Sequence, residues 1–155
     1  MSETNIRKEN IAIFKKLIKN NNKNLKLKTI NKLSKDIEAS IYDYIVQYAD
    51  SNNILKQWTN TCFKKCYLAK SRSIYSNLDK NSYIKNSTLM SNLIKNNIDV
   101  KQIAFMEPHQ LFPEKWDTLL KKKQMEDECI YEARMDMGTD LFHCGRCHKK
   151  NCSFY

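Results

Sequence analysis

The chain has 155 residues, of which 41% are hydrophobic and only 2 are Gly and 2 are Pro, so it has room for one helical core and a small appendage. Lys and Arg total 27 against 17 Asp and Glu, and the net charge of +10 suits a polyanion or an acidic protein surface as the partner. No secretory signal opens the chain and no apolar run approaches the roughly 20 residues that cross a bilayer, so we expect a soluble, intracellular protein. We also expect a monomer.

The first two predicted helices are amphipathic. Apolar residues from Ile6 to Ile18 keep a helical period, which predicts a first helix that breaks up at the Asn-rich run 20–24. That run, like the general excess of Lys and Asn, is also what an AT-biased coding sequence produces, so charge alone does not identify a partner. A second helix is predicted from Ile30 to Tyr48, where apolar residues recur at intervals of three and four.

A third long helix is predicted from Leu55 to Ala69 by the same spacing of apolar residues, with lysines on its other faces. These lysines are Lys64, Lys65 and Lys70. We expect this helix to pack on the first two, which gives an all-α fold built on a three-helix bundle.

Short helices are predicted after the bundle. Ser87 and Thr88 are typical of the cap of a helix over residues 89–94, and Asp99 is typical of the cap of another that runs to Phe105.

Prolines mark the next two helix starts. Pro108 suits the first turn of one helix and Pro113 suits the start of the one after it. Residues 114–135 are long and charged with sparse apolar positions, which predicts a partly solvated helical linker that ends before Gly138.

A C-x-x-C motif lies near the end of the chain. Cys144 and Cys147 offer two thiolates from one tight turn, and we expect Gly145 to give that turn its conformational freedom. Because a structural zinc ion requires four nitrogen or sulfur ligands, the motif predicts half of a zinc site.

Other uses of these cysteines are open. With His148 the motif also fits C-x-x-C-H, the haem-attachment pattern, although haem attachment normally takes place outside the cytoplasm. A thioredoxin-like redox pair lacks its βαβ surroundings. Cys152 and the flanking histidines His143 and His148 are poorly placed to complete a tetrahedron.

The remaining cysteines are expected to be packed or inert thiols. Cys62 and Cys66 are spaced i, i+4 on the third predicted helix, where they are either two ligands on one face or small core residues. The second interpretation is favoured, and Cys129 is expected to be inert. His109 is expected to lie in a loop, and the three His are too scattered for a catalytic cluster.

The C-terminal residues resemble a known family. Thr139-Asp140-Leu141-Phe142, the C-x-x-C motif and Lys149-Lys150-Asn151-Cys152 resemble the first half of the zinc ribbon of the transcription elongation factor S-II family, the transcript-cleavage factors of RNA polymerase II. Upstream segments are similar to the central domain of that family in the same order: Ile6-Arg7-Lys8, Ile37-Glu38, Tyr67, Lys70-Ser71-Arg72-Ser73, Asn77-Leu78 and residues 89–106.

The resemblance implies three parts. They are a central helical domain over residues 1–112, a helical linker over 113–138 and the first half of a small β zinc ribbon over 139–155, without the regulatory domain that precedes them in the family. The second C-x-x-C and the Asp-Glu hairpin of the family are expected beyond Tyr155, so no catalytic residue is assigned. Without the second ligand pair, we expect residues 139–155 to be flexible unless a partner or a continuation of the chain completes the site.

The resemblance also implies a function. Lys70, Arg72 and Asn77 match a signature that faces the polymerase in the family; the alternative is a solvated helix face with Asn77 capping its end. The predicted protein is an accessory factor, not an enzyme, that carries half of a zinc site and docks on a multisubunit RNA polymerase. It is expected in the nucleus or at another intracellular site of transcription, with nascent RNA or DNA as a further partner. The alternative function is a basic helical module that binds nucleic acid directly.

Overall fold

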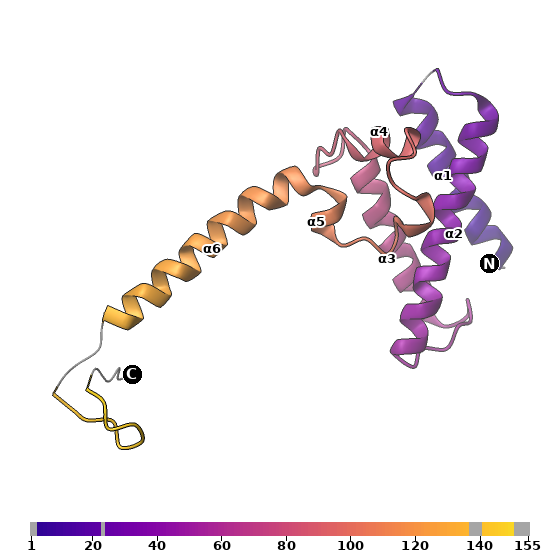
Figure 1. The fold of residues 1–155 in the computed structure, drawn as a ribbon. Coiled ribbons are helices and arrows are strands. Elements are labelled where there is room, and N and C mark those ends of the chain that lie inside the picture. The colour runs from indigo at the N-terminus through magenta and orange to yellow at the C-terminus, as the bar shows by residue number, and fades with distance from the viewer. Residues whose placement is uncertain (1–2, 23, 137–140, 151–155) are drawn as a thin grey trace. The chain divides into compact units, whose positions relative to one another are not determined.

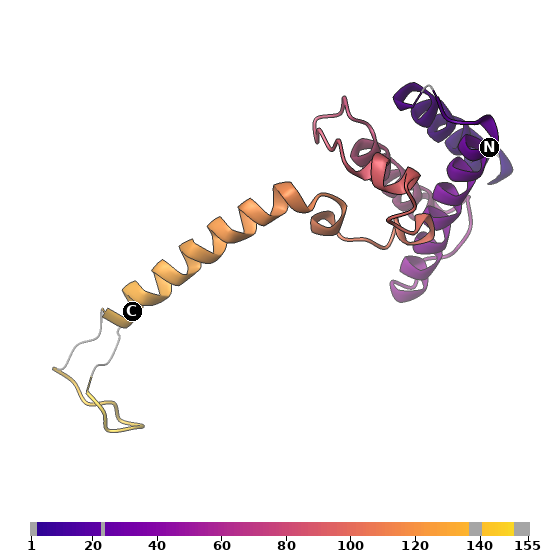
Figure 2. The same ribbon diagram turned by 45° about the horizontal axis from the view of Figure 1, so that its top comes forward.

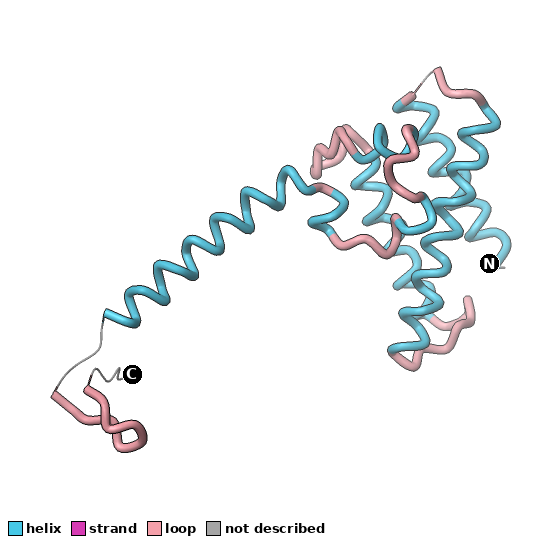
Figure 3. Tube along the Cα trace, viewed as in Figure 1, coloured by secondary structure: helices cyan, strands magenta, loops and turns pink. Residues whose placement is uncertain are grey.

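The fold is helical wherever the structure describes it. The computed structural model describes residues 3–22, 24–136 and 141–150, and in these ranges every regular element is a helix (Figure 3). The all-α class is therefore confirmed. The chain divides into two compact units, Met1–Phe112 and Pro113–Tyr155. Residues 141–150 contain turns and no strand, so the small β part stays a prediction, and Gly138, Thr139, Asp140 and Cys152 lie outside the described residues.

The first unit is built on three long helices. They are α1 (Glu3–Asn21), α2 (Leu27–Ser51) and α3 (Thr61–Leu78). Both α1 and α3 pack on α2, as the two views in Figures 1 and 2 show. Apolar side chains at helical spacing fill the space between them, among them Phe14, Ile18, Ile37, Ile41, Phe63, Tyr67 and Ile74, each at most 1% exposed.

The start of α3 corrects the predicted boundary. The apolar period that begins at Leu55 is not helical until Thr61, because Asn60 caps the helix: its Oδ1 accepts hydrogen bonds from the backbone N–H groups of Cys62 and Phe63 at 2.9 and 3.2 Å. Leu55 is exposed. Trp58 lies in the preceding loop, where its ring meets Tyr67 edge to face at 4.9 Å.

Three short elements follow the bundle. They are α4 (Leu89–Ile94), the 3₁₀-helix η1 (Val100–Gln102) and α5 (Pro108–Leu111). The side chain of Asp99 caps η1 as predicted, through the N–H of Lys101 at 3.0 Å, but the element has three residues and does not continue to Phe105. Ser40 attaches it to α2, since its hydroxyl donates to the carbonyl of Lys101 at 2.7 Å.

The predicted cap of α4 is confirmed in its position but not in its bonding. Thr88 occupies the cap position without a side-chain bond to the helix. Asn86, fully buried, takes that role: its Oδ1 accepts from the N–H groups of Thr88 and Leu89, and its amide donates to the carbonyl of Leu111 at 2.8 Å. One amide therefore fixes both α4 and the end of the first unit.

A buried polar network joins the three long helices. The guanidinium of Arg7 on α1 donates two hydrogen bonds to the carboxylate of Glu38 on α2, at 2.7 and 2.9 Å. The hydroxyl of Tyr67 on α3 donates to the same carboxylate at 2.9 Å. Asn10 donates to the oxygens of Tyr67 and Ser71, both at 2.9 Å. Glu38 is only 3% exposed, so these bonds replace the water that its charge has lost.

Aromatic rings extend this network toward the α2–α3 loop. Arg7 lies over the ring of Tyr42 at 4.0 Å from its centroid. Tyr42 stacks on Trp58 at 6.3 Å, and Trp58 in turn contacts Phe63 and Tyr67 edge to face. The loop that precedes α3 is therefore held by the same residues that hold the helices.

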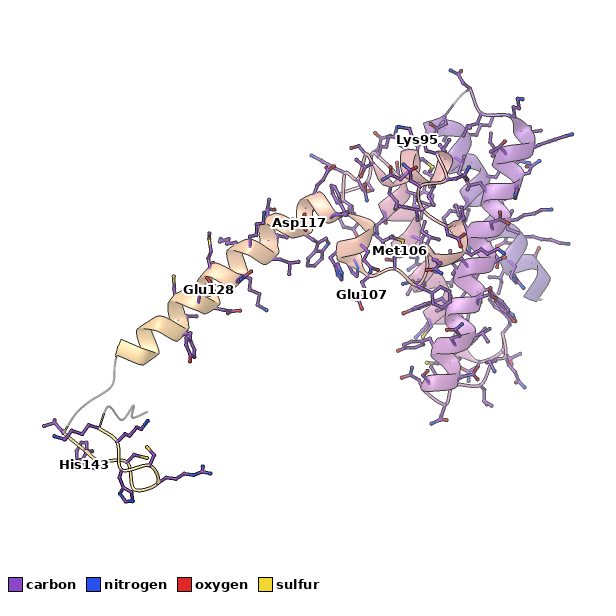
Figure 4. All side chains as sticks on the ribbon, in the orientation of Figure 1. Lys95, Met106, Glu107, Asp117, Glu128 and His143 are labelled. Carbon is purple, nitrogen blue, oxygen red and sulfur yellow. The ribbon has the colours of Figure 1, made fainter. Side chains whose placement is uncertain are left out.

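The second unit begins with the long helix α6 (Pro113–Asp136). All of its described side chains, those of residues 113–131, are exposed, and Asp117 and Glu128 in Figure 4 illustrate its charged surface. Lys122 and Glu126, one turn apart on α6, form an ion pair at 3.8 Å that supports the helix. None of the described helices combines the length and the apolar character that crossing a membrane requires.

The buried carboxylate predicts a stability difference. We expect Glu38→Gln to lower the free energy of unfolding by about 2 kcal/mol, because the amide loses the charge-assisted bonds to Arg7 and Tyr67. Urea unfolding followed by circular dichroism measures this. The matched control is Asp50→Asn, which removes the charge from the exposed pair with Lys56 and should cost at most about 0.5 kcal/mol. Equal losses would contradict the role of the network.

The same network predicts a response to alkali. Burial, and then the negative charge of Glu38, raise the pKa of Tyr67 above the ordinary tyrosine value of about 10. The folded state thus holds this proton more tightly than the unfolded state, so its contribution to stability is complete below about pH 10 and is lost as the pH rises further. Above about pH 10, Tyr67→Phe should flatten the fall in unfolding free energy, whereas Tyr83→Phe, at an exposed position, should leave the slope unchanged.

Candidate functional site

Helix α3 has one buried face, and its cations are spread over the rest of its circumference, which we call the basic face. Phe63, Tyr67, Ser71, Ile74 and Leu78 are buried against the bundle. The helix contains four basic residues and no Asp or Glu, and its basic residues are Lys64, Lys65, Lys70 and Arg72. Because Tyr67 and Ser71 belong to the polar network, the rotation of α3 about its own axis is fixed, and with it the direction of these cations.

Lys70 lies at the edge of that basic face. Its ammonium group lies 4.0 Å from the ring centroid of Tyr44 on α2. Burial lowers the pKa of Lys70, because water no longer fully solvates the charged form. Within the described part of the chain no carboxylate pairs with it. The group is therefore a half-buried cation stabilised by a ring alone, which favours contact with an external anion.

Arg72 and Lys65 are both exposed and share one stripe of α3, seven residues apart. Ala69, also exposed, lies between them on the same stripe. Neither cation has an ion-pair partner among the described residues. Both guanidinium and ammonium groups are thus available to a negatively charged surface.

Asn77 has a local contact. Its side-chain amide donates to the carbonyl of Ser73 at 2.9 Å, one turn earlier on the same helix. That bond supports the last turns of α3, as the capping alternative supposes, although the C-cap position itself is Asp79. Its assignment to a partner surface stays a prediction.

Two features of this face were missed by the sequence reasoning. Tyr44 and Tyr48 were assigned to the apolar stripe of the second helix, yet Tyr48 is 41% exposed and stacks on Tyr44 at the surface. Phe105, taken as the end of a helix, is 39% exposed and meets Tyr44 edge to face at 5.5 Å. Helical spacing alone does not distinguish such surface rings from core rings.

The C-x-x-C motif forms a tight turn, as predicted. The N–H of Cys144 donates to the carbonyl of Lys149 at 3.0 Å, and the N–H of His148 donates to the carbonyl of Cys144 at 2.8 Å. Hydrogen bonds from the backbone N–H groups of Cys147 and Arg146, and from the Cys147 thiol, lower the pKa of Cys144. Donors directed at a sulfur favour its thiolate form, which is the form that binds metal ions.

The residue that adopts a left-handed backbone conformation in this turn is not the one predicted. Gly145 does not adopt a positive φ; His148 does, at 54°. A left-handed conformation is unfavourable for most side chains, and His is among those that tolerate it. The expectation for Gly145 was therefore wrong.

The described residues provide only part of a zinc site. Cys144 and Cys147 supply two sulfur donors from one turn, which suits half of a tetrahedral site. The described residues contain no cluster of three or more His, Cys, Asp or Glu that could hold a metal ion. His143, labelled in Figure 4, and His148 belong to the same segment but form no such cluster.

The other cysteines do not enlarge the site. Cys62 is exposed and Cys66 is half-buried against the core, so only Cys66 fits the expectation of a packed thiol. Burial, and then the neighbouring Cys62, raise the pKa of Cys66. Cys129 is exposed on α6. His109 lies in α5 rather than in a loop, 3.8 Å from the carboxylate of Glu107.

The family profile and two known relatives that match this chain point to the same family. The profile of the family described as "Transcription factor S-II (TFIIS), central domain" matches residues 2–133. The chain is 26% identical over 121 residues to the "Transcription factor S-II-related protein" of Acanthamoeba polyphaga mimivirus, a match that covers 78% of this chain and 65% of that protein. It is 32% identical over 94 residues to "Transcription elongation factor S-II" of Schizosaccharomyces pombe, covering 57% of this chain and 30% of that protein.

The matches do not cover the whole length of these relatives. The chain spans about two thirds of the mimivirus protein, at 65%, and less than a third of the fission-yeast protein, at 30%. No solved structure matches the chain at a significant level.

The thiol turn predicts a metal response that depends on two residues. Co²⁺ added to the reduced chain should give a thiolate-to-metal absorption band, because Cys144 and Cys147 share one turn. Cys144→Ser and Cys147→Ser should each lose most of the band, whereas Cys62→Ser should keep it. An undiminished band in both turn variants would exclude this segment as the binding site.

Proposed function

The chain belongs to the transcription factor S-II central-domain family, and from this premise we propose that it is an elongation factor that docks on a multisubunit RNA polymerase. The basic face of α3 is the proposed contact. The division into a central domain over residues 1–112, a linker over 113–138 and a ribbon half over 139–155 is part of the proposal.

One observation carries the docking proposal: α3 presents cations without any acidic residue on the same helix. On α2, by contrast, acidic and basic residues are mixed, as where Lys35 precedes Asp36. A single-sign surface attracts an oppositely charged partner and raises its association rate. The buried network supports this role because it prevents α3 from turning its cations inward.

The proposed contact residues differ in their contributions. Arg72 and Lys65 are exposed, so their charges can pair with carboxylates of the polymerase at little desolvation cost. Lys70 adds a cation already held in place by Tyr44. Asn77 would contribute least, since its amide already donates to Ser73.

The chemistry of transcript cleavage is assigned to the polymerase, so this protein is proposed as an accessory factor and not as an enzyme. Residues 141–150 contain no Asp or Glu, and we therefore assign cleavage stimulation to no residue of this segment. Cys144 and Cys147 are proposed to hold one side of a zinc ion, which would order the turn around them. The proposed location is a site of transcription such as the nucleus.

Direct binding of nucleic acid is the competing function, because phosphates are attracted by the same cations. Binding measured before and after nuclease treatment separates polymerase docking from direct binding of nucleic acid. A polymerase contact would persist after nuclease treatment, whereas a contact through RNA or DNA would be lost.

The basic face predicts the outcome of a binding measurement. The double variant Lys65→Ala/Arg72→Ala should bind nuclease-treated, purified cognate polymerase about tenfold more weakly, a change of about 1.4 kcal/mol. The control Lys19→Ala removes an exposed cation from α1 and should stay within about twofold of the wild type. Loss of all binding after nuclease treatment would instead favour the nucleic-acid function.

A further inference from the structure

A shallow groove runs between α2 and α3 on the side of Lys70. It encloses about 300 Å³ and is lined by Tyr44, Ile45 and Tyr48 from α2 and by Cys66, Ala69, Lys70 and Ser73 from α3. Most of the lining atoms are apolar or aromatic. We call this feature the aromatic groove.

Aromatic rings remain exposed at its edge. Tyr48 and Phe105 are 41% and 39% exposed, and both contact Tyr44, by stacking at 6.4 Å and by an edge contact at 5.5 Å. Phe105 comes from the segment between η1 and α5, next to Met106, which Figure 4 labels. Large rings gathered at a solvent-exposed groove are typical of protein interfaces, where Tyr and Phe are enriched.

Cations border the aromatic groove and no acidic residue lines it. Lys70 forms part of its wall, with its ammonium over Tyr44. Residues three, four and seven apart share a helix face, so Lys65 and Arg72 flank Ala69 on the adjoining stripe. An occupant that inserts an apolar group here would therefore meet positive charge beside it.

The geometry favours a protein over a nucleobase. Stacking of a base needs a free ring face. The ammonium of Lys70 lies over Tyr44, and Tyr44 and Tyr48 stack on each other with an interplanar angle of 18°, so each of these two rings already has a partner on one face. An aliphatic or aromatic side chain needs only apolar volume, which the groove supplies.

We propose that the aromatic groove is the anchor of the polymerase contact and receives an apolar side chain of the polymerase surface that is flanked by carboxylates. This proposal rests on the docking function proposed above and makes it more specific. Exposed Lys65 and Arg72 orient the partner, while the fully desolvated contact in the groove supplies most of the affinity.

Ring removal tests the anchor. Tyr48→Ala should weaken binding to the purified, nuclease-treated cognate polymerase by about tenfold or more, whereas Tyr48→Phe, which keeps the ring, should bind as the wild type does. The matched control is Tyr83→Ala, since Tyr83 is 83% exposed in a loop and does not line the groove. Urea unfolding of each variant shows whether lost binding reflects lost folding.

Charge placed in the groove tests the chemistry of the occupant without removing any packed ring. Ala69 is exposed on a helix, so both Ala69→Glu and Ala69→Gln are expected to fold. The two side chains have the same length, and Ala69→Glu should weaken polymerase binding at least about fivefold more than Ala69→Gln, because its carboxylate repels an acidic partner.

The outcomes separate the two proposals. If the Lys65→Ala/Arg72→Ala variant binds weakly while Tyr48→Ala binds normally, docking stands and the groove is overturned as its anchor. If the wild-type chain does not bind polymerase, both proposals fail. If single-stranded RNA binds the wild type and Tyr48→Ala abolishes that binding, the groove is a nucleic-acid site and the protein anchor is overturned.

Discussion

The bundle depends on one buried carboxylate. Glu38 has lost nearly all its water, and an unpaired charge in that position would be expensive enough to unfold a domain of this size. Its partners come from different helices, Arg7 from α1 and Tyr67 from α3. The requirement to satisfy a single side chain therefore selects one arrangement of the three helices, whereas apolar packing alone tolerates small rotations and shifts.

The surface properties of α3 follow from that selection. With Tyr67 directed at Glu38, the stripe containing Lys65, Ala69 and Arg72 must point outward, and the intermediate stripe meets the tyrosines of α2. The cations and the aromatic groove are thus placed side by side by a contact on the opposite face of the helix. The packed core and the proposed contact surface both follow from one rotation of the helix about its axis.

Periodicity predicted the helices well where burial is continuous and poorly where it is not. The stripe of α2 was confirmed from Ile30 to Ile45 but not at Tyr48, which is exposed. The apolar residues from Leu55 onward continue the period through a loop, and only the amide of Asn60 determines where α3 begins. Arg7, Glu38, Tyr67 and Ser71 were identified as family anchors without their mutual bonds, and Asn10 was not identified at all, because a pattern of apolar positions treats Asn10 and Glu38 simply as polar. In the C-terminal turn, Gly145 was predicted to supply the unusual backbone conformation because it is a glycine. The left-handed residue is instead His148, whose N–H donates to the carbonyl of Cys144.

The regular geometry of the long helix α6 fixes both its length and the directions of its side chains. At about 1.5 Å per residue, its 24 residues give a rod of about 36 Å. A disordered segment of equal residue number would let the distance between its ends fluctuate widely, whereas a helix keeps it nearly constant. Insertion or deletion of a single residue within the helix would rotate the remainder of the helix by about 100° while changing its length by only about 1.5 Å, so the direction in which its side chains point is more sensitive to such a change than its length.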